Sequence, residues 1–120
     1  MFDDSIRPIA EAGLADLVDP GDRICDELHL IGTPGHSPGH LSVHIRSTGE
    51  AALLIGDVAH HPCQMAHPRW SSTVDFDPVQ AAHTRNAPFA TFAGTPAQIL
   101  GGHFVGGPIA RDGEAYRIIM

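Results

Sequence analysis

Imidazole and carboxylate side chains that could bind metal ions recur at three places along the 120-residue chain. The first is the segment Gly-Thr-Pro-Gly-His-Ser-Pro-Gly-His at residues 32–40, whose glycines and prolines predict a rigid loop carrying His36 and His40. The other two are Asp57 and His103, each directly preceded by glycine. Taken by itself, the first segment could be an ordinary turn with surface histidines. The repeated pattern favours a metal site, because histidine is the commonest metal ligand and the chain has nine of them.

A predicted β-hairpin would bring two of these side chains together. Residues 41–46 alternate apolar and polar side chains, residues 47–50 have turn chemistry, and residues 51–55 are continuously apolar. With a two-residue loop at Thr48-Gly49, the register places His40 opposite Asp57 with their Cβ atoms about 5 Å apart. A bulge in the hairpin would offset that pair by one residue. We therefore expect a site at the open end of the hairpin.

The remaining segments predict a mixed α/β domain. An N-terminal helix is expected after Asp3-Asp4-Ser5, with an apolar stripe that continues to Leu17. A second helix begins at Asp77-Pro78 and is bent or ended by Pro88. Further strands are expected at residues 24–31, 98–100 and 115–119, with a turn at 111–114 before the last. The second hairpin strand is apolar on both faces, which indicates a sheet covered by helices.

The charge balance and the apolar runs exclude several kinds of partner. Seven arginines and no lysine stand against fourteen acidic residues, and the formal net charge is −7, so no nucleic-acid partner is expected. No apolar run approaches the roughly 20 residues of a membrane span, and no basic-then-apolar leader opens the sequence. Cys25 and Cys63 are expected to be free thiols, because they form no C-x-x-C pair. These features predict a cytoplasmic protein without a membrane partner.

Three motifs, taken in order, resemble metallo-β-lactamase superfamily hydrolases, especially the branch with acyl-homoserine lactonases and methyl parathion hydrolase. They are Thr33-Pro-Gly-His-Ser-Pro-Gly-His40, Leu53-Leu-Ile-Gly-Asp57 and Gly102-His103-Phe104. The resemblance extends over nearly the whole chain and corresponds to the C-terminal part of a single domain in that family. It implies that residues 1–120 form half of an αββα sandwich, an α/β (α+β) unit with a mainly antiparallel sheet covered by helices.

The same resemblance implies a site and an activity. His40 would bind a first metal ion, Asp57 would bridge two ions as the catalytic residue, and His103 would bind the second ion. The implied cofactor is a divalent metal, zinc in the first place, with manganese, iron or cobalt as alternatives for the same ligands. The implied reaction is metal-dependent hydrolysis of a lactone, ester or related bond in a small-molecule substrate.

One departure from the family pattern weakens the enzymatic interpretation. The family's other ligands come from an upstream His-x-His-x-Asp-His motif, whereas the only histidines before His40 are His29 and His36. We therefore expect a fragment with fewer ligands than the three protein ligands usual for a catalytic zinc. The alternative is a non-catalytic half-domain that forms a homo-oligomer or pairs with a missing N-terminal half. An uncovered sheet face exposing Val43 and residues 53–55 would drive such association.

Three further histidines are secondary candidates. His60 and His61 follow Asp57 on a loop that should overhang the site, where one of them could orient substrate or hold a ligand in place. Both could equally be ordinary loop residues. His36 is expected to brace its turn by hydrogen bonds rather than to bind metal.

Overall fold

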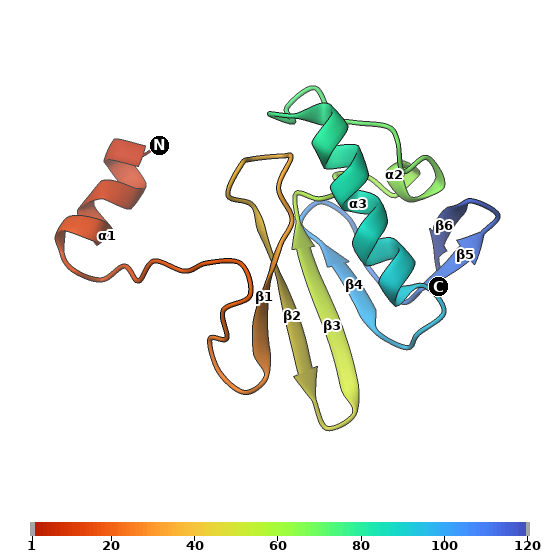
Figure 1. Cartoon of the computed structure of the whole chain (residues 1–120), viewed down its shortest axis with the longest axis horizontal. Coiled ribbons are helices and arrows are strands. Elements are labelled where there is room, and N and C mark those ends of the chain that lie inside the picture. The colour runs from red at the N-terminus through yellow and green to blue at the C-terminus, as the bar shows by residue number, and fades with distance from the viewer. Residues whose placement is uncertain (1, 120) are drawn as a thin grey trace.

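The computed structural model describes residues 2–119 and has a four-stranded sheet with one long helix across one face (Figure 1). The sheet order is β1-β2-β3-β4, in which β1, β2 and β3 pair antiparallel and β4 runs parallel to β3. A separate two-stranded sheet joins β5 and β6. The strands are β1 (Leu28–Gly32), β2 (Leu41–Ser47), β3 (Glu50–Gly56), β4 (Gln98–Gly101), β5 (Ile109–Asp112) and β6 (Ala115–Ile118).

The helical elements are η1 (Phe2–Ile6), α1 (Arg7–Glu11), α2 (Cys63–Ala66) and α3 (Pro78–Phe92). Within residues 2–119, none of these helices has the length and apolar character needed to cross a membrane. This arrangement confirms the predicted mixed α/β class, with a mainly antiparallel main sheet.

The hairpin has the predicted register. β2 and β3 pair from Ser47 with Glu50 at the loop to Val43 with Leu54, without a bulge between them. The two loop residues, Thr48 and Gly49, have φ angles of +50° and +84°, which a two-residue loop of this twist requires. The predicted register is therefore confirmed from the loop as far as Val43 and Leu54.

Helix α3 covers one face of the sheet and forms the core with it (Figure 1). Leu53 and Ile55 of β3, Ile99 of β4 and Phe89 of α3 are fully buried in one cluster. Asp77 caps α3 as predicted, because its carboxylate accepts a hydrogen bond of 2.9 Å from the backbone N–H of Gln80. The prediction that Pro88 ends or bends this region is wrong about the end, since α3 continues to Phe92. Burial of Phe89 against the sheet offsets the backbone hydrogen bond that proline cannot donate.

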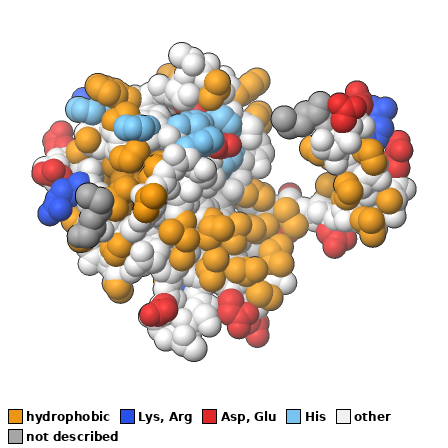
Figure 2. Space-filling view, turned by 180° about the vertical axis from the view of Figure 1, so that it is seen from behind, with side chains coloured by type: hydrophobic (Ala, Val, Ile, Leu, Met, Phe, Trp, Pro, Cys, Tyr) orange, Lys and Arg blue, Asp and Glu red, His pale blue; other side chains and the backbone are white. Residues whose placement is uncertain are grey.

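The opposite face of the sheet remains exposed. Leu54 and Leu100, which pair across β3 and β4, are each 39% exposed. Figure 2, seen from behind Figure 1, shows hydrophobic side chains gathered over this side of the molecule. The expectation that Leu53 and Ile55 would also be uncovered is wrong, because alternate residues of a strand point to opposite faces and these two point toward α3.

The chain ends differ from the sequence expectation. The N-terminal helix stops at Glu11 and buries no residue, although the apolar stripe continues to Leu17, which is fully exposed. All residues of that stripe are exposed among the described residues 2–119, so no packing supports a longer helix, and Gly13 adopts a positive φ of +69° that ends it. The expected turn at residues 111–114 begins two residues later, because Arg111 and Asp112 belong to β5.

The loop that carries His36 is fastened to α3 and to the segment just before it. Thr84 donates a side-chain hydrogen bond of 2.6 Å to the carbonyl of Pro34, and the backbone N–H of Asp77 donates one of 2.9 Å to the carbonyl of Gly35. Gly35 has a φ of +134°, and a Cβ at this position would overlap the backbone of Ala81. Only glycine allows this close approach.

We therefore expect Gly35→Ala to lower the free energy of unfolding by about 3 kcal/mol, because the added methyl group forces the loop away from α3 and strains φ. Gly39→Ala in the same loop is the matched control, since a Cβ there meets no atom within 4 Å. The control should change stability by less than about 1 kcal/mol. Urea unfolding measures both, and equal effects of the two substitutions would contradict this account of the loop.

A second expectation concerns pH and His44, which lies half-buried on β2. Its ring packs edge-on against Phe92 with centroids 5.2 Å apart, and burial, aided by Arg46 and His29, lowers its pKa. The folded state therefore disfavours the charged imidazole. As the pH falls below about 6.5, the unfolded chain binds a proton that the folded chain resists, so stability decreases.

His44→Gln removes this contribution, and the loss of unfolding free energy between about pH 7.5 and about pH 5.5 should be smaller than in the wild type. His83→Gln, an exposed position on α3, is the control and should leave the loss unchanged. Urea unfolding at the two pH values checks the difference. An identical loss in wild type and His44→Gln would exclude the effect.

Candidate metal centre

The ends of β2, β3 and β4 meet at one edge of the sheet. β4 runs parallel to β3 and β2 runs antiparallel to it, so the segment before β2 and the segments after β3 and β4 lie together. Asp57 directly follows β3, and His103 follows β4 by two residues. The His103 Nε2 atom lies 2.7 Å from Oδ1 of Asp57. These two candidate residues therefore contact each other directly.

His40 contacts the backbone of Asp57 rather than its carboxylate. Its Nε2 accepts a hydrogen bond of 3.1 Å from the Asp57 N–H, so the ring proton is on Nδ1, which lies 2.8 Å from Oγ1 of Thr33. Burial lowers the pKa of His40, although Asp57 opposes this shift, and the neutral ring is favoured. A Cβ on Gly56 would lie 3.0 Å from Nε2, which explains the glycine before Asp57.

Two more histidines face the Asp57 carboxylate. Nε2 of His36 lies 3.5 Å from Oδ2, and Nε2 of His60 lies 3.9 Å from Oδ1. Burial alone would raise the pKa of Asp57, but the hydrogen bond from His103 and the imidazoles of His36, His103 and His60 outweigh it and lower the pKa. Burial also lowers the pKa of His60. The site therefore favours a carboxylate beside a neutral His60 ring.

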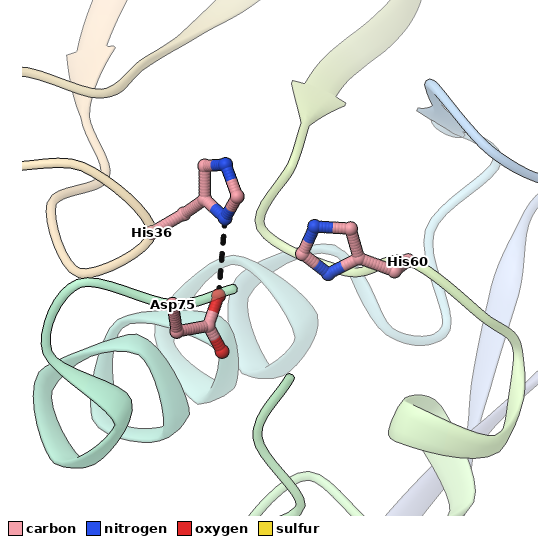
Figure 3. Close-up of side chains that lie close together, drawn as sticks. All are labelled: His36, His60 and Asp75. Atoms are coloured by element: carbon pink, nitrogen blue, oxygen red, sulfur yellow. Dashed lines mark hydrogen bonds and ion pairs between the residues drawn. The ribbon is translucent and has the colours of Figure 1, made fainter. Parts of the chain in front are cut away.

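Asp75 contacts His36 of this cluster, and Arg85 lies next to Asp75. The Asp75 side chain is fully buried and its Oδ1 lies 3.1 Å from Nδ1 of His36 (Figure 3). Its Oδ2 accepts a hydrogen bond of 2.8 Å from the backbone of Ser72 and lies 3.8 Å from the Arg85 guanidinium. The expectation that His36 braces its turn by hydrogen bonds fits this contact, but its Nε2 still faces Asp57. Sequence reasoning missed Asp75.

Arg85 fastens the loop that follows β3. It is fully buried in α3 and donates hydrogen bonds to the carbonyls of Val58 at 2.7 Å, Pro68 at 2.9 Å and Trp70 at 2.6 Å. Burial lowers its pKa, while the charge of Asp75 opposes this. The available sequence signal was its place on the same helical face as Ala81 and Phe89, where a charged residue needs buried partners.

The described residues contain two sets of three side chains whose potential ligand atoms lie within 4.8 Å of one another. One set is Asp57, His60 and His103, and the other is His36, His60 and Asp75. His40 belongs to neither set. His61 is exposed and its Nδ1 accepts a hydrogen bond of 3.1 Å from the backbone of Cys63, so it does not join the cluster. The assignment of His40, Asp57 and His103 as metal ligands stays a prediction.

Comparison with solved structures finds metallo-β-lactamase superfamily hydrolases. The structure matches hydrolase AbOPH of the β-lactamase superfamily with a TM-score of 0.87 and 29% identity, over 97% of this chain and 42% of that one. It matches the dizinc quorum-quenching lactonase AidC with a TM-score of 0.82 and 18% identity, over 98% and 46%. A probable metal-dependent hydrolase from Staphylococcus aureus matches with a TM-score of 0.70 and 20% identity, over 91% and 41%.

The predicted resemblance to this superfamily is confirmed at the level of the fold. The chain spans less than half the length of each of these three proteins. No protein-family model and no curated protein matches the sequence.

Because Arg85 links α3 to the loop and to Asp75, we expect Arg85→Met to lower the free energy of unfolding by about 3–5 kcal/mol. Methionine keeps most of the volume but leaves Asp75 without its counter-ion and the three carbonyl groups without their donor. Arg69→Met is the control, because Arg69 is exposed on the same loop, and it should change stability by less than about 0.5 kcal/mol. Urea unfolding compares the two variants. A loss below about 1 kcal/mol for Arg85→Met would contradict the structural role given to this residue.

Proposed function

We propose that this chain is part of a metal-dependent hydrolase that cleaves a lactone, ester or related bond in a small-molecule substrate. The observation that carries the proposal is the Asp57 carboxylate, which three imidazole nitrogens approach to between 2.7 and 3.9 Å at one edge of the sheet. The hydrolase AbOPH and the lactonase AidC share this fold. Residues 1–120 would form the C-terminal part of one such domain.

The donor set fits a divalent metal ion. Neutral imidazoles and an ionised carboxylate are ligands for zinc, and also for manganese, iron or cobalt. Both ring nitrogens of His60 are buried without a hydrogen-bond partner among the described residues, which an ion nearby would remedy. Asp57 and His103 would hold the ion, with His40 from the N-terminal side of the hairpin. A divalent ion at this place supplies Lewis acidity and a hydroxide nucleophile at neutral pH.

The side chains of the chain itself define how substrate would reach the site. His103 and Asp57 are 51% and 39% exposed, so the edge of the sheet is open to a small molecule. The Asp57 carboxylate is held ionised by its imidazole neighbours and fixes the position of His103. Nε2 of His40, which accepts a hydrogen bond from the Asp57 N–H in this structure, is the atom that would bind the ion in place of that hydrogen bond.

The exposed sheet face supports the proposal that more protein is needed to complete the domain. Leu54 and Leu100 lie on a face that no helix covers, and the related proteins are more than twice as long as this chain. We propose that an N-terminal half, carrying His-x-His-x-Asp-His, covers this face and completes the ligand set. The same exposed face favours a second candidate, a non-catalytic half-domain that covers itself by forming a homo-oligomer.

The test is to assay the chain alone and after co-expression with the portion of AbOPH that the chain does not match. Lactone, aryl ester and phosphotriester substrates would be tried with added zinc or manganese. We expect no hydrolysis by the chain alone and hydrolysis by the pair. Asp57→Asn should then reduce the rate of the pair by at least about 100-fold, since the ion loses its anionic ligand.

His83→Gln is the control in the same assay, because this exposed side chain on α3 takes no part in the cluster, and its rate should match that of the wild type. Hydrolysis by the lone chain that Asp57→Asn abolishes would show that no second half is needed. An inactive pair that is shown by size-exclusion chromatography to assemble would favour the non-catalytic candidate.

A further inference from the structure

A pocket of about 790 Å³ lies where the segment after α2, the first turns of α3 and the turn between β5 and β6 come together (Figure 1). Pockets that bind small molecules have volumes of roughly 300–1,000 Å³, so this one is large enough for such a ligand. None of the side chains around Asp57 lines it. The pocket is therefore separate from the candidate metal centre.

One wall of the pocket is a face of α3 that does not pack on the sheet. Val79, Ala82, His83 and Asn86 line the pocket, and their spacing of three and four residues places them on the same side of the helix. Val79 is 80% exposed. The short side chain of Ala82 leaves space beside these larger neighbours. This wall can therefore contact an apolar part of a ligand.

A second wall is a pair of stacked rings. The rings of His67 and Trp70 have centroids 4.0 Å apart and planes inclined by 17°, and both residues line the pocket. The Trp70 carbonyl accepts hydrogen bonds of 2.6 Å from Arg85 and 3.1 Å from Gln64, so the backbone at this position is fixed. Trp70 is nevertheless 57% exposed. A ring fixed in this way can stack with a planar ligand at a small cost in conformational entropy.

The polar groups of the pocket are mainly hydrogen-bond donors. The Tyr116 hydroxyl donates a hydrogen bond of 3.0 Å to Oδ1 of Asn86, which leaves the Asn86 NH₂ group to donate to a ligand. Within residues 2–119, neither the Trp70 indole N–H nor the Arg69 guanidinium has a hydrogen-bond or ion-pair partner. A carboxylate suits these donors, because it accepts hydrogen bonds and pairs with a guanidinium through two of them.

Glu114 is the only acidic residue among the described residues that line the pocket. It would favour a cationic ligand, which could also lie over the face of Trp70. Its side chain is exposed, however, so water and salt weaken its effect on a ligand. Because three donor groups stand against this one carboxylate, the pocket is better suited to an anionic ligand than to a cationic one.

We propose that this pocket binds a planar aromatic carboxylate. The aromatic ring of the ligand stacks on Trp70 and packs against Val79 and Ala82, and its carboxylate accepts hydrogen bonds from Arg69 and Asn86. The site does not depend on the metal ion or on the proposed hydrolase function, and its failure would leave that function untouched.

The single tryptophan of the chain makes a direct test possible, because its indole N–H gives one signal in a ¹H–¹⁵N NMR spectrum. Titration with 2-naphthoate should shift this signal to saturation, with a Kd of about 1 mM or tighter. Three related compounds should each bind at least about threefold more weakly. They are 2-naphthamide, which lacks the charge, decalin-2-carboxylate, which lacks the aromatic plane, and 2-naphthylmethylammonium, which has the opposite charge.

Two variants test the residues of the pocket. Arg69→Gln should weaken binding of 2-naphthoate by about threefold to fivefold and leave binding of 2-naphthamide unchanged, because only the carboxylate pairs with the guanidinium. Ala82→Phe should weaken binding of 2-naphthoate at least about 10-fold, because the added ring occupies the space of the ligand. The matched controls are Arg117→Gln on β6 and Ala87→Phe on α3, both at exposed positions outside the pocket, and they should bind like the wild type.

The backbone amide signals in the same spectra show whether each protein is folded, and the assembled pair with the AbOPH portion replaces the lone chain if the lone chain is unfolded. The proposal is overturned if 2-naphthoate causes no saturable shift of the Trp70 signal. It is also overturned if the amide or the ammonium compound binds as tightly as 2-naphthoate, or if folded Ala82→Phe binds 2-naphthoate like the wild type.

Discussion

The residues at the edge of the sheet depend on the hydrogen bonds and the ion pair of the buried Arg85 guanidinium. Residues 57–77 contain only the short helix α2, so most of their backbone groups lack partners from regular secondary structure. Arg85 donates to three carbonyls of this segment from a fully buried position in α3. A guanidinium is not deprotonated in proteins, so its burial requires a counter-ion, and Asp75 provides it. The same Asp75 orients His36, which connects the folding of the loop to the chemistry of the site.

The strand directions supply the other constraint. A hairpin and a parallel strand place one loop and two strand ends at the same edge, so residues far apart in sequence converge on Asp57. The glycine before Asp57 lets His40 approach the backbone, and Gly35 lets its loop approach α3. The rest of the sheet is asymmetric, with one face packed on α3 and the other exposing Leu54 and Leu100. The edge is thus built by this chain, and we propose that further protein packs on the exposed face.

Local rules were enough for the parts of the fold in which neighbouring residues interact. Alternation and a two-residue loop gave the hairpin register, and Asp77-Pro78 gave the start of α3. The predicted ends of the helix at Pro88 and of the N-terminal helix were wrong, because the length of each helix depends on packing. Phe89 packs in the core, so helix α3 continues past Pro88. Leu17 is fully exposed, so the N-terminal helix ends before it.

The sequence by itself determined the hairpin register that brings His40 next to Asp57, and the resemblance of its motifs to a known family assigned His103 to the same site. Only the tertiary structure decided that His36 and His60 face the Asp57 carboxylate and that Asp75 and Arg85 stand behind them. His36 and Asp75 are 39 residues apart, and no periodicity connects them. They pair because the Asp75 carboxylate, the Arg85 guanidinium and the His36 imidazole come together in one place when the chain packs. Burial is a property of the packed chain, so no single segment of the sequence specifies it.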